Sequence, residues 1–80
     1  MAQAKKKRKD PLLAAFAATV RKRRYALSIT QEELAEKCDF HVNYIGGIER
    51  GERNPSLTSL GMLAKGLECS VKDLLPEELQ

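Results

Sequence analysis

The stretch QEELAEKCDFHVNYIGGIER, from Gln31 to Arg50, decides the fold of this chain. Its small and apolar residues fall in two short segments with helical spacing, separated by a connection of about three residues. These residues are Leu34, Ala35, Cys38, Phe40, Ile45 and Ile48. Ala35 is small enough for a second helix to cross close to it. The pattern predicts two short helices joined by a tight turn.

The ends of these two helices are marked by residues that commonly cap helices. Thr30 and Glu33 form a capping box, in which the threonine hydroxyl accepts from a free helix amide and the glutamate reaches back. The first helix is expected to end at Asp39, a residue type that tolerates the left-handed backbone conformation of a tight turn. The second is expected to run over His41–Arg50 and to stop at Gly51.

Three further helices are predicted around this pair. Apolar stripes predict a helix over Leu12–Leu27 and another over Leu57–Leu67, and a cap at Ser70 predicts a last short helix through Leu75. The two stripes consist of Leu13, Phe16, Ala17, Val20 and Leu27, and of Leu57, Leu60, Leu63, Ala64 and Leu67. Five helices without a strand signal predict an all-α fold.

The 80 residues carry a net charge of +3, and this charge is unevenly distributed. Residues 1–30 hold nine Lys or Arg against one acid, whereas residues 31–80 hold five against ten. We expect residues 1–10 to form a disordered basic arm and residues 11–80 to form one domain. The basic end fits nucleic acid or an anionic membrane surface, although lysine-rich termini are commonly only solvated, and KKKRK also resembles a nuclear-import signal.

The composition argues against an enzyme and against a metal centre. The chain has one histidine, no serine or cysteine placed to pair with it, and no glycine loop of the kind that binds phosphate. Cys38 and Cys69 both fall on apolar stripes, so we expect them to be reduced and buried rather than metal ligands. No cofactor or small-molecule ligand is expected. Without a long apolar run or a secretory signal, the protein is expected to be cytoplasmic.

The segment Ile29–Leu75 resembles the Xre family of helix-turn-helix regulators, which contains the lambdoid phage repressors and Cro. Its most specific parts are TQEELA and YIGGIERGERNPSL, and the second is especially similar to the controller proteins of restriction-modification systems. The resemblance implies a five-helix, lambda-repressor-like domain that binds double-stranded DNA as a homodimer. Such a domain regulates transcription, as a repressor or an activator, at a near-palindromic operator. An antitoxin-like module that binds both DNA and a protein is the alternative.

The resemblance assigns DNA contacts to the second helix of the pair and to its flanks. Val42 and Asn43 match the principal base-reading positions, where Asn43 can pair with adenine and Val42 can pack on a thymine methyl group. Arg50 and Arg53 match positions that contact phosphates. Gln31 would give its side chain and a helix amide to a phosphate.

Four residues have more than one interpretation. Tyr44 either lies near the DNA backbone or fills the edge of the core. His41 is a weak helix cap and a candidate phosphate or base contact. Gly46 and Gly47 each cost roughly 1 kcal/mol in a helix interior. They either let the helix backbone approach DNA closely, which we favour, or avoid a clash inside the protein.

Arg24 and Glu49 match a partly buried ion pair of the phage repressors. They are expected to tie the first helix to the third and so to orient the DNA-reading helix. Arg21, which shares the first helix with Arg24, is interpreted as part of a solvated basic face.

The small size of the domain predicts association with a second copy. About seventy residues make a marginal core, and a partner subunit can supply the missing burial. Met62, Leu75 and Leu79 are left over from the core stripes, so we expect them in a two-fold dimer interface.

Overall fold

The computed structural model describes residues 10–80, and every regular element in this part of the chain is helical. The elements are α1 (Pro11–Ala26), α2 (Gln31–Cys38), α3 (Val42–Glu49), α4 (Leu57–Gly66), α5 (Val71–Leu74) and a 3-10 helix, η1 (Glu77–Leu79). The prediction of an all-α, five-helix fold is confirmed, and the α-helices lie within one residue of their predicted bounds. Helix η1 was not predicted, because its sequence EEL has no apolar stripe.

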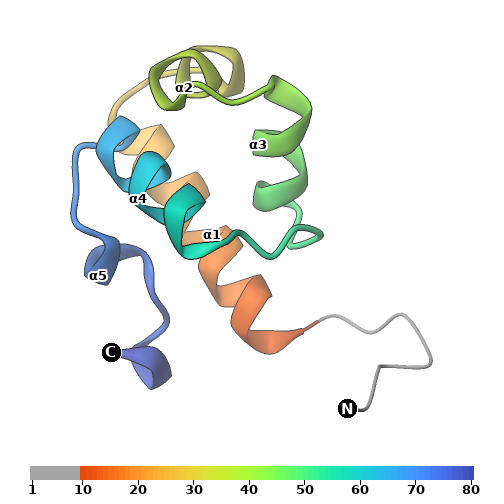
Figure 1. Cartoon of the computed structure of the whole chain (residues 1–80), viewed down its shortest axis with the longest axis vertical. Coiled ribbons are helices and arrows are strands. Elements are labelled where there is room, and N and C mark those ends of the chain that lie inside the picture. The colour runs from red at the N-terminus through yellow and green to blue at the C-terminus, as the bar shows by residue number, and fades with distance from the viewer. Residues whose placement is uncertain (1–9) are drawn as a thin grey trace.

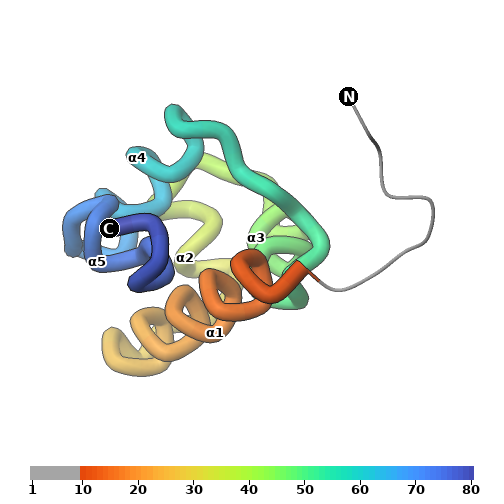
Figure 2. Tube along the Cα trace, turned by 90° about the horizontal axis from the view of Figure 1, so that it is seen from below, coloured from red at the N-terminus to blue at the C-terminus, as the bar shows by residue number. Residues whose placement is uncertain are grey.

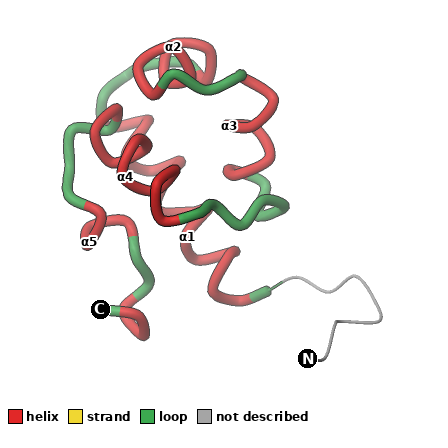
Figure 3. Tube along the Cα trace, in the orientation of Figure 1, coloured by secondary structure: helices red, strands yellow, loops and turns green. Residues whose placement is uncertain are grey.

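Helix α1, the longest of the helices, lies along one side of the domain in Figure 2. Figure 1 shows α2 and α3 following one another across one end of the molecule, with α4 in front of α1. Both α3 and α5 pack against α1, and Figure 2 shows them on different sides of the molecule. The loops are short except for residues 50–56, which connect α3 to α4 (Figure 3). None of the described helices is long and apolar enough to span a membrane.

The core lies where the five α-helices meet. Its largest fully buried side chains are Val20, Leu34, Ile45, Ile48, Leu63 and Leu74. Two expectations about burial are wrong. Leu57, which was placed on the buried stripe of α4, is 77% exposed, because it lies at the margin of that stripe in the first turn of the helix. Cys69 is only partly buried, since it lies in the loop after α4, whereas Cys38 is buried as expected.

Helix α1 begins at Pro11 and has a capped N-terminus. Asp10, which was assigned to the disordered arm, is the N-cap of α1, and its side chain accepts from the amide of Leu12 at 2.9 Å. Pro11 follows at the first helical position, where a missing N–H costs nothing. Residues 1–9, which hold the KKKRK sequence, lie outside the described residues, so the arm stays a prediction.

Three of the α-helices, α1, α2 and α4, are followed by a residue in the left-handed conformation that is not glycine. Ser28, Asp39 and Glu68 have φ values of 57°, 62° and 61°. Asp39 at the end of α2 therefore adopts the conformation that the sequence predicted for it. At the end of α3 the left-handed residue is Gly51, with φ 76°. Since only glycine adopts this conformation without a steric cost, the other three positions reduce the stability of the domain.

Candidate nucleic-acid interface

Helices α2 and α3 form a helix pair with defined ends. The capping box of α2 is complete, with the Glu33 amide 3.0 Å from the Thr30 hydroxyl and the Thr30 amide 2.8 Å from the Glu33 carboxylate. In the turn, the Phe40 amide donates to the carbonyl of Ala35 at 2.9 Å. His41 caps α3, because its Nδ1 accepts from the amide of Asn43 at 3.0 Å. The histidine is thus a functioning cap, and its Nδ1 is occupied by this contact.

A buried ion pair holds α3 against α1, as expected for Arg24 and Glu49. The Arg24 guanidinium donates twice to the Glu49 carboxylate, at 2.7 Å and 3.0 Å, and once to the carbonyl of Ile29 at 2.9 Å. Only 9% of Arg24 and 3% of Glu49 are exposed. The hydrogen bond to Glu49 raises the pKa of Arg24 above its ordinary value although burial opposes this. The two parallel bonds define both the distance and the direction of α3 relative to α1.

Two further side chains join this ion pair. The Gln31 amide donates to the Glu49 carboxylate at 2.9 Å, which ties the start of α2 to the end of α3. The Arg21 guanidinium donates to the backbone carbonyl of Glu49, at the C-terminal end of α3 where helix carbonyls lack helical partners. Arg21 is therefore half-buried and bonded rather than solvated, which corrects the interpretation of the basic face. The signal in the sequence was its spacing of three residues from Arg24, since such residues share one helix face.

The side chains predicted to read bases differ in accessibility. Asn43 is exposed in the first turn of α3. Val42 is half-buried and packs against the core cluster, so only part of its surface is open. Tyr44 is also half-buried, and its ring stands edge-on to Phe40 with 4.9 Å between ring centroids.

The two glycines of α3 are buried, so in the free protein they do not form an open surface for DNA. A Cβ atom on Gly47 would lie 2.7 Å from Cγ of Arg53, and one on Gly46 would lie 3.0 Å from Nη1 of Arg50. The atoms that cover the glycines belong to arginine side chains from the end of α3 and the following loop. Glycine at these two positions therefore avoids a clash with the arginine side chains. Close approach of the α3 backbone to DNA stays a prediction.

Arg50 and Arg53 are exposed and flank the C-terminal end of α3. Arg50 forms an ion pair with Glu52, with 3.1 Å between Nε and Oε1. The guanidinium of Arg53 lies over the ring of Tyr44, 5.9 Å from its centroid. Neither cation is buried, so both are accessible to an anion.

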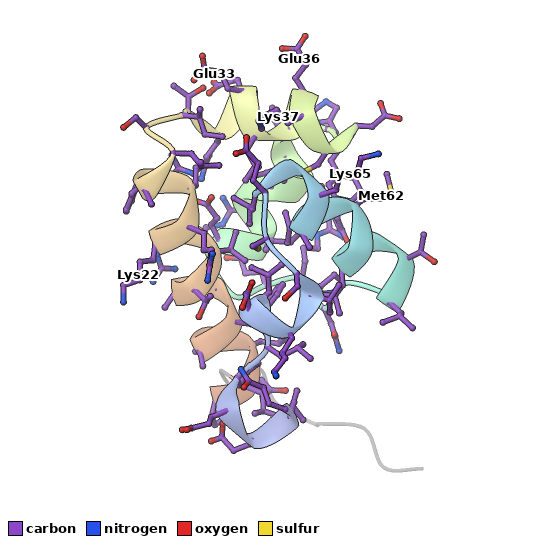
Figure 4. All side chains as sticks on the ribbon, turned by 90° about the vertical axis from the view of Figure 1, so that its left-hand side faces the viewer. Lys22, Glu33, Glu36, Lys37, Met62 and Lys65 are labelled. Carbon is purple, nitrogen blue, oxygen red and sulfur yellow. The ribbon has the colours of Figure 1, made fainter. Side chains whose placement is uncertain are left out.

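The acidic side chains lie on more than one side of the domain. Glu52 pairs with Arg50 beside the end of α3. Figure 4, drawn from the side opposite α3, shows Glu33 and Glu36 projecting outward from α2. In the same view, Lys65 and Met62 project from α4 at the right of the picture.

Comparisons with known proteins agree with this geometry. The helix-turn-helix family model matches residues 20–74. The chain is 45% identical to control protein C.SmaI from Serratia marcescens over 79% of its own length and 75% of the relative. It is 46% identical to control protein C.BamHI from Bacillus amyloliquefaciens, with 75% of each chain covered.

Solved structures of the same type superpose on this chain. The restriction-modification controller protein C.AhdI from Aeromonas hydrophila matches with a TM-score of 0.77 and 36% identity, covering 79% of this chain and 96% of that one. The controller C.Esp1396I, solved as a tetramer in complex with its natural 35 base-pair operator, matches with a TM-score of 0.73 and 36% identity over 81% of this chain and 96% of that one. The chain therefore belongs to the helix-turn-helix transcription regulators and, among them, to the family of the restriction-modification controller proteins.

Proposed function

We propose that this chain binds double-stranded DNA as a homodimer and controls transcription of a restriction-modification system from a near-palindromic operator. Helix α3 is the recognition helix and enters the major groove. The observation that carries the proposal is the position of α3, which Arg24, Gln31 and Arg21 hold by one end while Asn43 at its other end stays exposed. The operator complex of C.Esp1396I supports the same use of the fold.

The roles of the individual residues follow from their placement. Asn43 reads an adenine, and Val42 contributes the open part of its side chain to a thymine methyl group. Arg50 and Arg53 bind phosphates, and the N-terminal end of α2 at Gln31 attracts a phosphate through its amides. The side chain of Gln31 serves both α3, through Glu49, and the adjacent phosphate.

Four residues of the recognition surface have secondary roles. His41 orders the first turn of α3 and presents its other ring nitrogen to the DNA backbone. The Tyr44 hydroxyl lies beside the backbone while its ring packs on Phe40. Gly46 and Gly47 keep α3 slim at the groove wall, so that the helix and the arginine side chains that lie on it can approach DNA closely.

A second copy of the chain covers an apolar surface next to the loop between α3 and α4. Leu57 is 77% exposed and Leu79 is 53% exposed. A pocket of about 230 Å³ is lined among others by Leu12, Leu60, Leu75 and Leu79, and Leu57 precedes Leu60 by one turn of α4. A protruding leucine and an apolar pocket on one surface are self-complementary under a two-fold axis. Leu75 and Leu79 belong to this surface, whereas Met62 projects from α4 on the side shown in Figure 4.

The decisive experiment is selection of duplexes from a random pool by the purified protein, with its solution mass measured alongside. We expect a near-palindrome whose half-site centres lie about 34 Å apart, one helical turn, because two recognition helices then enter successive major grooves. A Leu57→Glu variant should become monomeric and bind a single half-site weakly, while the neighbouring exposed Thr58→Glu should stay dimeric. A monomeric wild type that protects one unrepeated site would contradict the proposal.

Two substitutions distinguish base reading from phosphate binding. Asn43→Ala should cost about 1 to 3 kcal/mol at the selected site and flatten the preference at one base pair of each half-site. Arg53→Ala should weaken binding to selected and random duplexes alike. Lys65→Ala, which removes an exposed cation of α4, is the control for net charge. An unchanged consensus for Asn43→Ala would mean that α3 is not the recognition helix.

The other functional classes receive less support. The relatives that cover most of this chain are controller proteins, so the antitoxin-like alternative is not favoured. These relatives are regulators, and we assign no catalytic activity, cofactor or small-molecule ligand to this chain. Its site of action is the cytoplasmic DNA.

A further inference from the structure

Gly47 and Arg53 form a contact that no other residue type at position 47 permits. The Cγ atom of Arg53 lies 2.7 Å from the place where a Cβ of residue 47 would be, and its Nε and Cδ atoms follow at 3.3 Å and 3.6 Å. Separations under about 3.0 Å from a Cβ do not occur in proteins, so even alanine would displace the arginine. The middle of this side chain, and not only its flexible end, rests on the helix backbone.

The backbone after α3 directs Arg53 to this place. Gly51 adopts the left-handed conformation with φ 76°, which reverses the chain direction at the end of the helix. The amide of Glu52 then donates to the carbonyl of Gly47 at 2.9 Å. This bond holds the loop against the same helical turn on which the Arg53 side chain rests.

A second contact fixes the charged end of the side chain. The guanidinium of Arg53 lies 5.9 Å from the centroid of the Tyr44 ring, within the range of a cation–π interaction. Tyr44 lies one helical turn before Gly47, and its ring is held edge-on by Phe40 at 4.9 Å. The aliphatic part of Arg53 thus packs on Gly47, and its guanidinium packs on the Tyr44 ring.

We propose that Gly47 is a positioning residue for Arg53, and that it holds the guanidinium in place for a DNA phosphate before DNA arrives. The physical reason is entropic, because a free arginine loses several rotatable bonds when it binds, whereas an ordered one has already lost them. This inference rests on the proposed function. It replaces direct approach of the Gly47 backbone to DNA as the main reason for the glycine.

Gly61 of α4 provides a matched control outside the recognition surface. Nothing lies within 4 Å of a Cβ at this exposed position. Gly61→Ala therefore introduces the same methyl group, and the same gain in helix propensity, without moving Arg53.

The test is a double-mutant cycle on DNA affinity. Wild type, Gly47→Ala, Arg53→Ala and the double variant are titrated onto the duplex selected from a random pool, at several salt concentrations. We expect each single variant to bind about fivefold to thirtyfold more weakly, the effect of a lost charged contact, and to lower the salt slope by about 0.9. The double variant should bind no more weakly than Arg53→Ala alone, and Gly61→Ala should bind like wild type.

The melting temperature separates positioning from folding. Gly47→Ala should melt at or above the wild-type temperature, because alanine favours the helix and the displaced arginine is exposed. A measurement without any substitution completes the test. In the free wild-type protein, NMR should show contacts between the Arg53 Hγ and Gly47 Hα protons and a ring-current shift of the Arg53 side chain from Tyr44.

Three outcomes would overturn the inference. Gly47→Ala binding like wild type would mean that the position of Arg53 does not depend on the glycine. A double variant whose loss is the product of the two single losses would show that Gly47 acts on DNA independently of Arg53. Absence of the Gly47 to Arg53 contacts in the NMR spectra would have the same force. By contrast, a wild type that selects no duplex would refute the proposed function itself.

Discussion

The two junctions that position the helix pair are built from opposite chemistry. The polar junction consists of Arg21, Arg24, Gln31 and Glu49, and it joins α1 and α2 to α3. The apolar junction consists of Cys38, Leu63 and Gly66, and it joins α2 to α4. The polar junction specifies direction, because its hydrogen bonds require particular angles. The apolar junction specifies distance, because Gly66 has no side chain where Cys38 approaches.

The largest effect is expected from breaking the polar junction on one side only. Glu49→Ala should lower the free energy of unfolding by about 3 to 5 kcal/mol, since it leaves the Arg24 guanidinium buried without its carboxylate. Urea or thermal unfolding measures the loss. The double variant Arg24→Met with Glu49→Leu should recover most of it, because paired apolar replacements remove both buried charges. A double variant no more stable than Glu49→Ala would contradict this account.

The apolar junction should respond to added volume. Gly66→Ala places a methyl group on the Cys38 sulfur and also 3.4 Å from the Cys38 amide nitrogen. We expect a loss of about 1 to 3 kcal/mol from overpacking. Cys38→Ala in the same chain makes room for the methyl group and should restore part of the stability. Gly61→Ala is the control, since nothing lies within 4 Å of a Cβ at that position of α4.

The apolar junction also makes the free energy of unfolding depend on pH in the alkaline range. Burial raises the pKa of the Cys38 thiol from 9.0 to about 11. A raised pKa in the folded state contributes stability that is fully present below pH 9 and is lost as the pH rises through about 11. Urea unfolding below pH 9 and near pH 11 should therefore show a smaller alkaline loss for Cys38→Ala than for wild type. Equal losses in both proteins would assign the alkaline effect to other groups.

The smallest effect concerns the ends of the two helices at the apolar junction. Asp39 after α2 and Glu68 after α4 both have positive φ. Asp39→Gly should raise the free energy of unfolding by up to about 1 kcal/mol, the steric gain less the extra entropy of glycine in the unfolded chain. Glu68→Gly should gain less, because it also removes the exposed ion pair with Lys37. Thermal melts compare the two, and the reverse order would show that the Asp39 side chain contributes to the turn.

Local features of the sequence predicted the fold because each helix carries its own signals. The capping boxes at Thr30 and Ser70, the stop at Gly51 and the apolar stripes act over a few residues, so they can be read without the rest of the chain. The Arg24 to Glu49 pair was predicted from the family resemblance, and the structure contains it. The DNA contacts assigned to Asn43, Val42 and the arginines remain proposals for the experiments above.

Tertiary structure decided which side chains form contacts between those helices. Arg21 looks like a solvated cation in the sequence, yet it bonds to the end of α3, twenty-eight positions further on. Gln31 shares the Glu49 carboxylate with Arg24, and the two glycines of α3 are covered by arginines that follow them. The sequence by itself determined where each α-helix begins and ends to within one residue, because capping and periodicity are short-range. Only the packed structure determined which side chains contact the buried Glu49 carboxylate and the backbone of α3 at its glycines. Those contacts depend on how helices that are far apart in the chain cross one another.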